Sequence, residues 1–216
     1  MKKAKKGLIL SLILLFIPVM VIGCSSKPKV GADETAKILF DFYIKGNKEA
    51  LTKIDLPKDK IEEISKMQKE RTIQTLKTNF TTQGVKVSDE KIKQIYTARV
   101  EALKKLSAKA EIVSQNDESA TVKIKMTYIN EVALDEKAGK DAAEEIKKSN
   151  ITDRQEAINK GIDIYIQNLI KEYKNVKPSS DMKEQTSKFV IKDKTWMPED
   201  NNGFALGIGK MTIGLK

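Results

Sequence analysis

A change of hydrophobic period near residue 107 constrains the fold of this chain more than any other feature. Apolar residues at 120, 122, 124, 126 and 128 alternate with Thr and Lys, which predicts a strand with one buried side. The preceding stretch, 88–106, has apolar residues at helical spacing and Ser88 in position to cap a helix. A polar turn at 115–119 and a shorter apolar run at 111–113 complete an antiparallel hairpin. Helices and an antiparallel sheet must therefore share one fold.

Helical spacing dominates the segments on both sides of this hairpin. Asp33 can cap a first helix that Gly46 ends, and Thr152 with Gln155 has the spacing of a capping box. The apolar positions of the third helix change phase along its length, which indicates a bend or two packing partners. The predicted helices span 33–46, 48–54, 57–79 and 88–106, with a further helical segment between 134 and 173.

The end of the chain returns to strands in this interpretation. Residues 188–191 and 195–197 flank Asp193 and Lys194 in a second hairpin, and 204–206 forms another strand, with Gly207 and Gly209 as bends. The order predicts an α+β fold in which N-terminal helices pack on a curved antiparallel sheet. The additional helical segment lies between the two strand hairpins.

The amino terminus has the layout of a secretory signal peptide. Four lysines between positions 2 and 6 precede an apolar stretch that ends at Ile22 and is interrupted by Pro18. This stretch is shorter than the roughly 20 residues that a membrane-spanning helix needs. Val21, Ile22 and Gly23 are followed by Cys24, the only cysteine. The four residues resemble the lipobox of bacterial lipoproteins, which implies diacylglyceryl transfer to Cys24 and cleavage before it; a plainly secreted protein would keep a free thiol there.

The leader sets the predicted organisation and location. Residues 1–23 form a signal peptide that is removed, 24–32 a lipidated cysteine with a flexible tether, and 33–216 a single α+β domain. The predicted location is the extracytoplasmic face of the cell membrane. Cleavage removes four lysines and no acid, so the net charge of +10 falls to +6. This excess is typical of a solvated lysine-rich surface, and nucleic acid is not an expected partner because aromatic residues are few.

The arrangement resembles a known superfamily and a known family. The first helix broken at Gly46 and Asn47, the strand 120–128 and the late hairpin 190–196 are similar to the nuclear transport factor 2-like (cystatin-like) superfamily. The mature chain as a whole resembles Gram-positive bacterial lipoproteins of the domain of unknown function 5105 type. The superfamily resemblance implies a sheet that curls around a cavity at one end. The candidate pocket residues are Tyr128, Trp196 and Met126, which could equally be core residues.

The residue types argue against catalysis. The chain has no histidine, which excludes Ser-His-Asp and Cys-His nucleophiles and the usual zinc sites. The segment 199–203 is similar to a calcium loop, but Pro198 and Gly209 replace its terminal carboxylates. We therefore expect no enzyme activity, no metal site and no cofactor.

Two functions remain open for such a chain. The first is a binding or interaction module of the cell envelope, held to membrane lipid by acylated Cys24. Its partner would be an anionic wall polymer, a small ligand or a membrane protein. The second is an accessory or structural envelope protein that acts through helix faces without a pocket. A lined cavity would count against the second function, and a filled sheet interior against the first.

Overall fold

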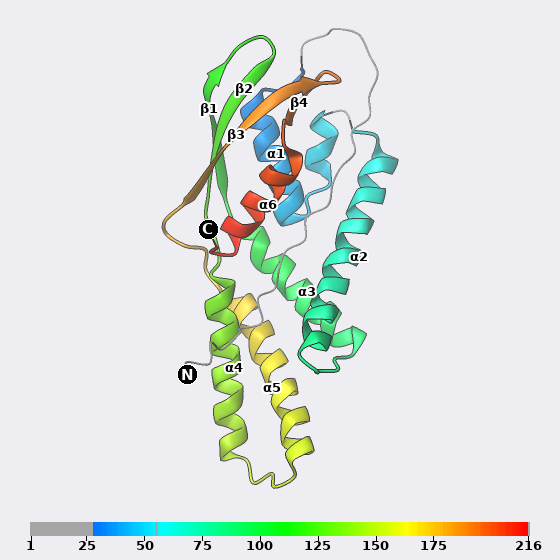
Figure 1. The fold of residues 1–216 in the computed structure, drawn as a ribbon, viewed down its shortest axis with the longest axis vertical. Coiled ribbons are helices and arrows are strands. Elements are labelled where there is room, and N and C mark those ends of the chain that lie inside the picture. Colours follow the sequence, from blue (N-terminus) through cyan, green and yellow to red (C-terminus); the bar gives the residue numbers. More distant parts are fainter. Residues whose placement is uncertain (1–27, 55, 216) are drawn as a thin grey trace.

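The structure, a computed structural model, describes residues 28–54 and 56–215. Helices pack against a four-stranded antiparallel sheet, so the α+β class predicted from the sequence is confirmed (Figure 1). The helices are α1 (Ala32–Lys45), the 3-10 helix η1 (Glu49–Ile54), α2 (Lys58–Thr82), α3 (Asp89–Lys104), α4 (Glu131–Lys148), α5 (Arg154–Asn175) and α6 (Asn201–Thr212). The strands are β1 (Ala108–Gln115), β2 (Ser119–Met126), β3 (Lys183–Lys192) and β4 (Thr195–Pro198).

The strands follow one another across the sheet in sequence order, each antiparallel to the next. Val122 of β2 pairs with Ile112 of β1 on one side and with Ser187 of β3 on the other. The alternation that predicted β2 matches the burial of its side chains. Four apolar residues of this strand are at most 2% exposed: Ala120, Val122, Ile124 and Met126. One side of the sheet therefore belongs to the core.

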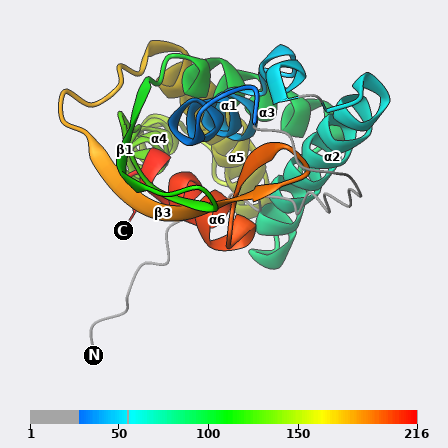
Figure 2. The same ribbon diagram turned by 90° about the horizontal axis from the view of Figure 1, so that it is seen from above.

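Helices α1 and α6 fill the concave side of the sheet (Figure 2). Nine of the 14 residues of α1 are buried, which is why its sequence is apolar on most faces. Phe204 of α6 meets Phe189 of β3 edge to face, with ring centroids 5.5 Å apart. The sheet interior is thus occupied by side chains of these two helices.

Helix α6 corrects the expectation of a strand at 204–206. Asp200 caps the helix, because its Oδ1 accepts a hydrogen bond from the Gly203 amide at 2.9 Å. The buried residues Phe204, Ala205 and Ile208 follow a helical spacing. Gly207 is no bend but lies inside α6, where a Cβ would be 2.2 Å from Oε1 of the Gln185 side chain of β3. The short apolar run was compatible with either period.

Two predicted helix starts are shifted by one or two residues. Helix α1 begins after Gly31, and Asp33 lies in its first turn, where a carboxylate favours the positive end of the helix dipole. Helix α5 is capped by Asp153, which accepts a hydrogen bond from the Glu156 amide at 2.7 Å, and not by Thr152. The Ser88 cap of α3 is confirmed, since its side chain accepts from the Lys91 amide.

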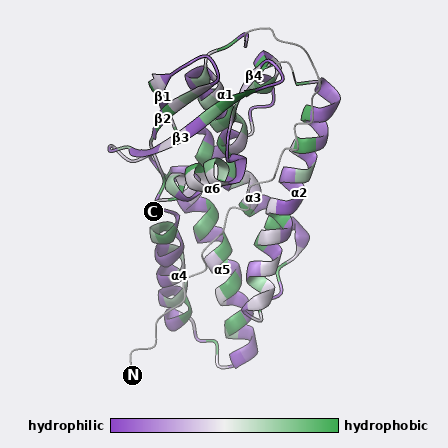
Figure 3. Cartoon of the chain, turned by 45° about the horizontal axis from the view of Figure 1, so that its top comes forward, coloured by the Kyte–Doolittle hydropathy of each residue, from purple (hydrophilic) through white to green (hydrophobic). Residues whose placement is uncertain are grey.

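The remaining helices form a layer that extends beyond the sheet (Figure 1). Helices α4 and α5 pair as an antiparallel hairpin, and α5 also packs on α3. Figure 3 shows that α4 is mainly hydrophilic, whereas hydrophobic residues mark α1. The core of the described residues runs from Ala32 to Ile208, so a fragment beginning at Pro28 keeps every described element and its core.

A candidate ligand-binding cleft

A cleft of about 370 Å³ lies between the C-terminal end of α1, the first two-thirds of α2 and the second half of α3. It forms because α2 is a long helix with little apolar surface: only Ile61, Ile64, Leu76 and Phe80 of its 25 residues are buried. Near its middle, α2 reaches α1 through Gln68, whose Nε2 donates to the Tyr43 carbonyl at 3.0 Å. Farther along, Phe80 packs against Tyr165 of α5. The phase change in the apolar pattern of α2 thus corresponds to two different packing partners.

The floor of the cleft is apolar and aromatic. Phe42, Tyr43 and Ile44 come from the last turns of α1, just before Gly46 ends the helix with φ 67°. Tyr96, Val100 and Leu103 come from one face of α3, at the i, i+4 and i+7 spacing of a helix. Burial raises the pKa of the Tyr43 and Tyr96 phenols, so both side chains are neutral at physiological pH.

The wall on α2 is polar and carries two lysines. The polar lining residues of α2 come from successive turns on the side that faces the cleft: Glu62, Ser65, Lys66, Lys69 and Thr72. Lys48 from the loop after α1 pairs with Glu62 at 2.6 Å across one end. Among the described residues, Lys66 and Lys69 have no ion-pair partner, so the cleft has a positive rim.

Arg99 belongs both to the cleft lining and to a buried ion pair behind it. Its Nε donates to Glu131 Oε1 at 2.8 Å and its second terminal nitrogen to Oε2 at 3.2 Å. The two side chains are 3% and 6% exposed, respectively. Burial raises the pKa of the Glu131 carboxyl, and the adjacent guanidinium opposes that rise. The positive charge of Arg99 is therefore matched inside the core and is not available to the cleft.

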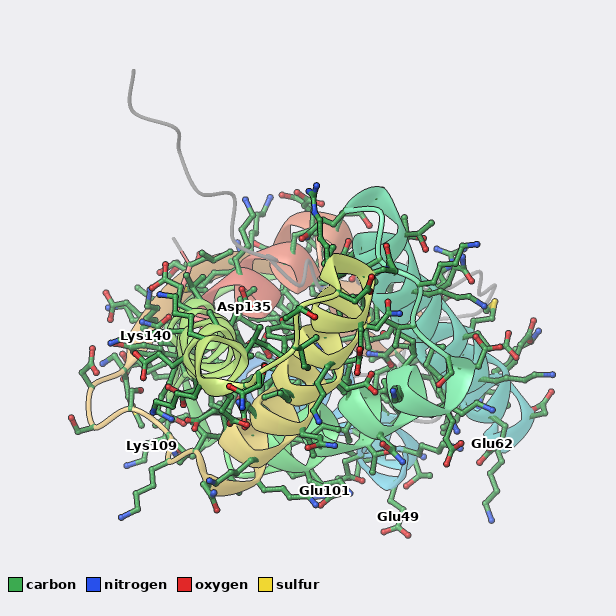
Figure 4. The ribbon with its side chains drawn as sticks, turned by 90° about the horizontal axis from the view of Figure 1, so that it is seen from below. Glu49, Glu62, Glu101, Lys109, Asp135 and Lys140 are labelled. Carbon is green, nitrogen blue, oxygen red and sulfur yellow. The ribbon has the colours of Figure 1, made fainter. Side chains whose placement is uncertain are left out.

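Two tyrosines of α5 extend this buried network. The Tyr165 hydroxyl donates to Asp135 Oδ1, one turn after Glu131 on α4. Tyr173 is buried beside Arg99 and Glu131, and its burial raises its pKa well above the usual value. In Figure 4, Asp135 lies on the inner side of α4 and Lys140 on its outer side. The network holds the α4–α5 hairpin on α3 and forms the support of the cleft floor.

The structure does not bring the three candidate pocket residues together. Met126 pairs with Lys183 at one end of β3, whereas Trp196 pairs with Ile191 near the other end. Eight residues of strand separate the two positions, about 26 Å along β3. Met126 and Trp196 are buried in the core, and neither lines the cleft. The two residues therefore do not share one pocket, and α1 and α6 fill that side of the sheet.

Tyr128 follows β2 and has a structural role near the carboxyl end. Its hydroxyl donates to Asp181 Oδ2 at 3.2 Å. The Lys183 ammonium lies 5.0 Å from its ring centroid and also donates to the Gly214 carbonyl at 2.8 Å. Tyr128 therefore links the start of β3 to the end of the chain, far from the cleft lining. Cys24, with Val21, Ile22 and Gly23, lies outside the described residues.

The buried ion pair and the cleft both correspond to features of the sequence. Arg99 is a charged residue on the otherwise apolar face of α3. Glu131 and Asp135 lie one turn apart, so both reach the same neighbours. The polar residues of α2 follow the helical period on one side of the helix, as on a solvated face. The tertiary structure decides which helices lie opposite these residues, namely α1 and α3 across the cleft.

The part of the chain that the structure describes offers neither a metal site nor a membrane span. It contains no group of three or more acidic, cysteine or histidine side chains close enough to hold a metal ion. No described helix combines the length and apolar character needed to cross a bilayer.

Fold and cleft define an α+β domain whose helices cover one side of an antiparallel sheet and enclose a small cleft beside it. The family model described as a domain of unknown function, DUF5105, matches residues 35–210. The chain belongs to this family, as the sequence resemblance predicted.

One solved structure with a similar fold is a "putative lipoprotein (ycdA)" from Bacillus subtilis subsp. subtilis str. 168. The TM-score is 0.61 at 17% sequence identity, and the match covers 83% of this chain. The match spans 56% of the length of that protein. No curated protein matches the chain.

Proposed function

We propose that this protein is a lipid-anchored module on the extracytoplasmic face of the cell membrane. The leader pattern that ends in Cys24 supports an acylated amino terminus, and the similar fold of a protein described as a lipoprotein is consistent with it. Seven residues, 25–31, lie between the cysteine and α1, so the start of α1 would lie within about 29 Å of the acylated residue. Two acyl chains would hold the domain on the bilayer almost permanently.

The module is proposed to bind a partner and not to catalyse a reaction. The observation that carries this proposal is the cleft, which combines an apolar floor with a polar wall from a different helix. This is the usual composition of a binding site. Of the lining side chains that could transfer protons, Glu62 pairs with Lys48, Arg99 pairs with Glu131 and the two tyrosines are protonated, which leaves the Lys66 and Lys69 ammonium groups unpaired among the described residues. No metal or cofactor is part of the proposal.

The filled sheet interior favours the second candidate function, an accessory protein that acts through helix faces. Photo-crosslinking in intact envelopes separates the two candidates. A photoreactive amino acid at Val100 reports on the cleft, and one at Lys140, whose side chain is 76% exposed, reports on the outer face of α4. The binding module predicts adducts at position 100 and none at position 140. Adducts at position 140 alone would support the helix-face function instead.

The anchor is tested by Cys24→Ala, with Ser25→Ala as the matched control. We expect the cysteine variant to accumulate as unprocessed precursor or to be shed, and the serine variant to stay with the membrane fraction. Membrane retention of Cys24→Ala with a normally processed amino terminus would contradict the proposed anchor.

A further inference from the structure

From the charges around the cleft we infer its ligand class: a small organic anion with an apolar body and one carboxylate or phosphate group. This inference rests on the proposed binding function and adds the chemistry of the ligand. It depends on the placement of charge around the cleft, on the apolar character of the floor and on the cleft size.

The cationic rim has two neighbouring ammonium groups, neither of which forms an ion pair with another described residue. Lys66 and Lys69 lie three residues apart on α2, about 5 Å along the helix axis, so both can approach one anionic group. Glu62, the only acidic residue of the lining, is already engaged by Lys48. Arg99 is neutralised by Glu131. The charge that remains for a ligand is therefore that of the two lysines.

The floor requires an apolar body as well as a charge. Tyr96 and Val100 offer partly exposed apolar surface below the rim, and Phe42, Tyr43 and Leu103, each at most 5% exposed, close the floor beneath them. A wholly polar anion such as inorganic phosphate or a glycerol phosphate polymer would leave this surface in water. Burying it contributes about 25 cal/mol for each Å². The cleft volume of about 370 Å³ is near the lower end of the range for small-molecule sites, about 300 to 1,000 Å³.

The probe is 8-anilinonaphthalene-1-sulfonate, a fluorescent anion with an apolar body, titrated into a fragment of residues 28–216. Three competitors separate charge from apolar character: decanoate, decyltrimethylammonium and inorganic phosphate, each below any micellar concentration. We expect decanoate to displace the probe at a concentration at least fivefold lower than decyltrimethylammonium requires. Inorganic phosphate should displace it weakly or not at all.

Substitutions in the cleft lining test whether the probe binds in this cleft. Lys66→Ala combined with Lys69→Ala should weaken probe and decanoate binding about fivefold, since each of the two lost ion pairs contributes about 0.5 kcal/mol, about twofold in affinity. The matched control is Lys58→Ala combined with Lys93→Ala, which removes the same charge from α2 and α3 outside the cleft lining and should change binding less than twofold. Val100→Trp and, from the opposite wall, Thr72→Trp should block the cleft. Far-ultraviolet circular dichroism confirms that each variant is folded.

The outcomes separate this inference from the proposed function. Weaker binding in the blocking variants, with equal displacement by the two decyl compounds or no effect of the lysine pair, would leave the cleft a binding site and overturn the anion inference. Unchanged probe binding in both folded blocking variants would overturn the inference and the proposed binding function together. Displacement by inorganic phosphate at the concentration that decanoate needs would also overturn the requirement for an apolar body.

Discussion

The Arg99 guanidinium and the Glu131 carboxylate form a two-contact ion pair that is almost fully buried between α3 and the first turn of α4. Arg99 also lines the cleft, so this pair connects the floor of the candidate site to the α4–α5 hairpin behind it. A buried ion pair adds little net stability, because desolvation offsets the attraction, but the loss of one partner leaves an uncompensated charge.

Removing one member of the pair should therefore be costly. Glu131→Gln should lower the free energy of unfolding by about 3 to 5 kcal/mol, measured by urea denaturation. Arg99→Met combined with Glu131→Met should cost less than either single change. The exposed pair Lys188 and Glu199, 2.8 Å apart, is the control, and its loss should cost less than about 1 kcal/mol. Additive losses in the double variant would contradict this description of the pair.

The Tyr165 hydroxyl should stabilise the fold by donating to Asp135. Tyr165→Phe leaves that buried carboxylate oxygen without this donor, and we expect a loss of about 1 to 3 kcal/mol in thermal or urea unfolding. Tyr128→Phe removes a hydroxyl bound to Asp181 at the surface and should leave the unfolding midpoint unchanged. Equal effects of the two variants would show that burial of the Asp135 contact does not matter.

Stability should fall in alkaline solution because buried phenols are held neutral. Burial raises the pKa of Tyr43, Tyr165 and Tyr173 above the value of about 10 that they have in the unfolded chain. Their contribution is complete below pH 10 and is lost as the pH rises beyond it, since only the unfolded chain releases those protons. The free energy of unfolding, measured from pH 8 to 11.5, should decline less steeply in Tyr165→Phe. An unchanged slope would contradict the assignment.

Helix α5 is capped by Asp153 and not by the adjacent Thr152, and substitution of each residue tests this assignment. Asp153→Ala should lower the free energy of unfolding by about 1 kcal/mol, because the Glu156 amide loses its acceptor. Thr152→Ala serves as the control and should change it by a few tenths at most. A larger effect at Thr152 would favour the capping box expected from the sequence.

Local patterns predicted the elements that depend on nearby residues. The alternation in β2 and the Ser88 cap of α3 are confirmed because burial on one side and a free first-turn amide are local demands. The run Phe204–Leu206 is too short to separate a strand from a helix by its period, and the Asp200 cap of α6 lies in a segment that is similar to a calcium loop. A local pattern separates a helix from a strand only when the hydrophobic period continues over enough residues.

The candidate site depends on contacts that the sequence does not display. The cleft lining comes from three helices between Phe42 and Leu103, and the orientation of α2 decides which of its polar faces is enclosed. Tyr128 and Trp196 are candidate pocket residues by sequence because they are large aromatic residues near strands. In the structure, the Trp196 side chain is buried in the core and the Tyr128 hydroxyl contacts Asp181 at the surface. Arg99 had a visible signal, a charge on an apolar helix face, whose partner is 32 residues away.

The central claim is that the cleft between α1, α2 and α3 is where this protein binds its ligand. A ¹H–¹⁵N nuclear magnetic resonance titration of the 28–216 fragment with decanoate tests it most directly. We expect the largest shift changes at 42–46, 62–72 and 96–103, and smaller ones at those positions in the Lys66→Ala and Lys69→Ala double variant. Changes centred on Tyr128 or Trp196, or none below the micellar concentration, would contradict the claim.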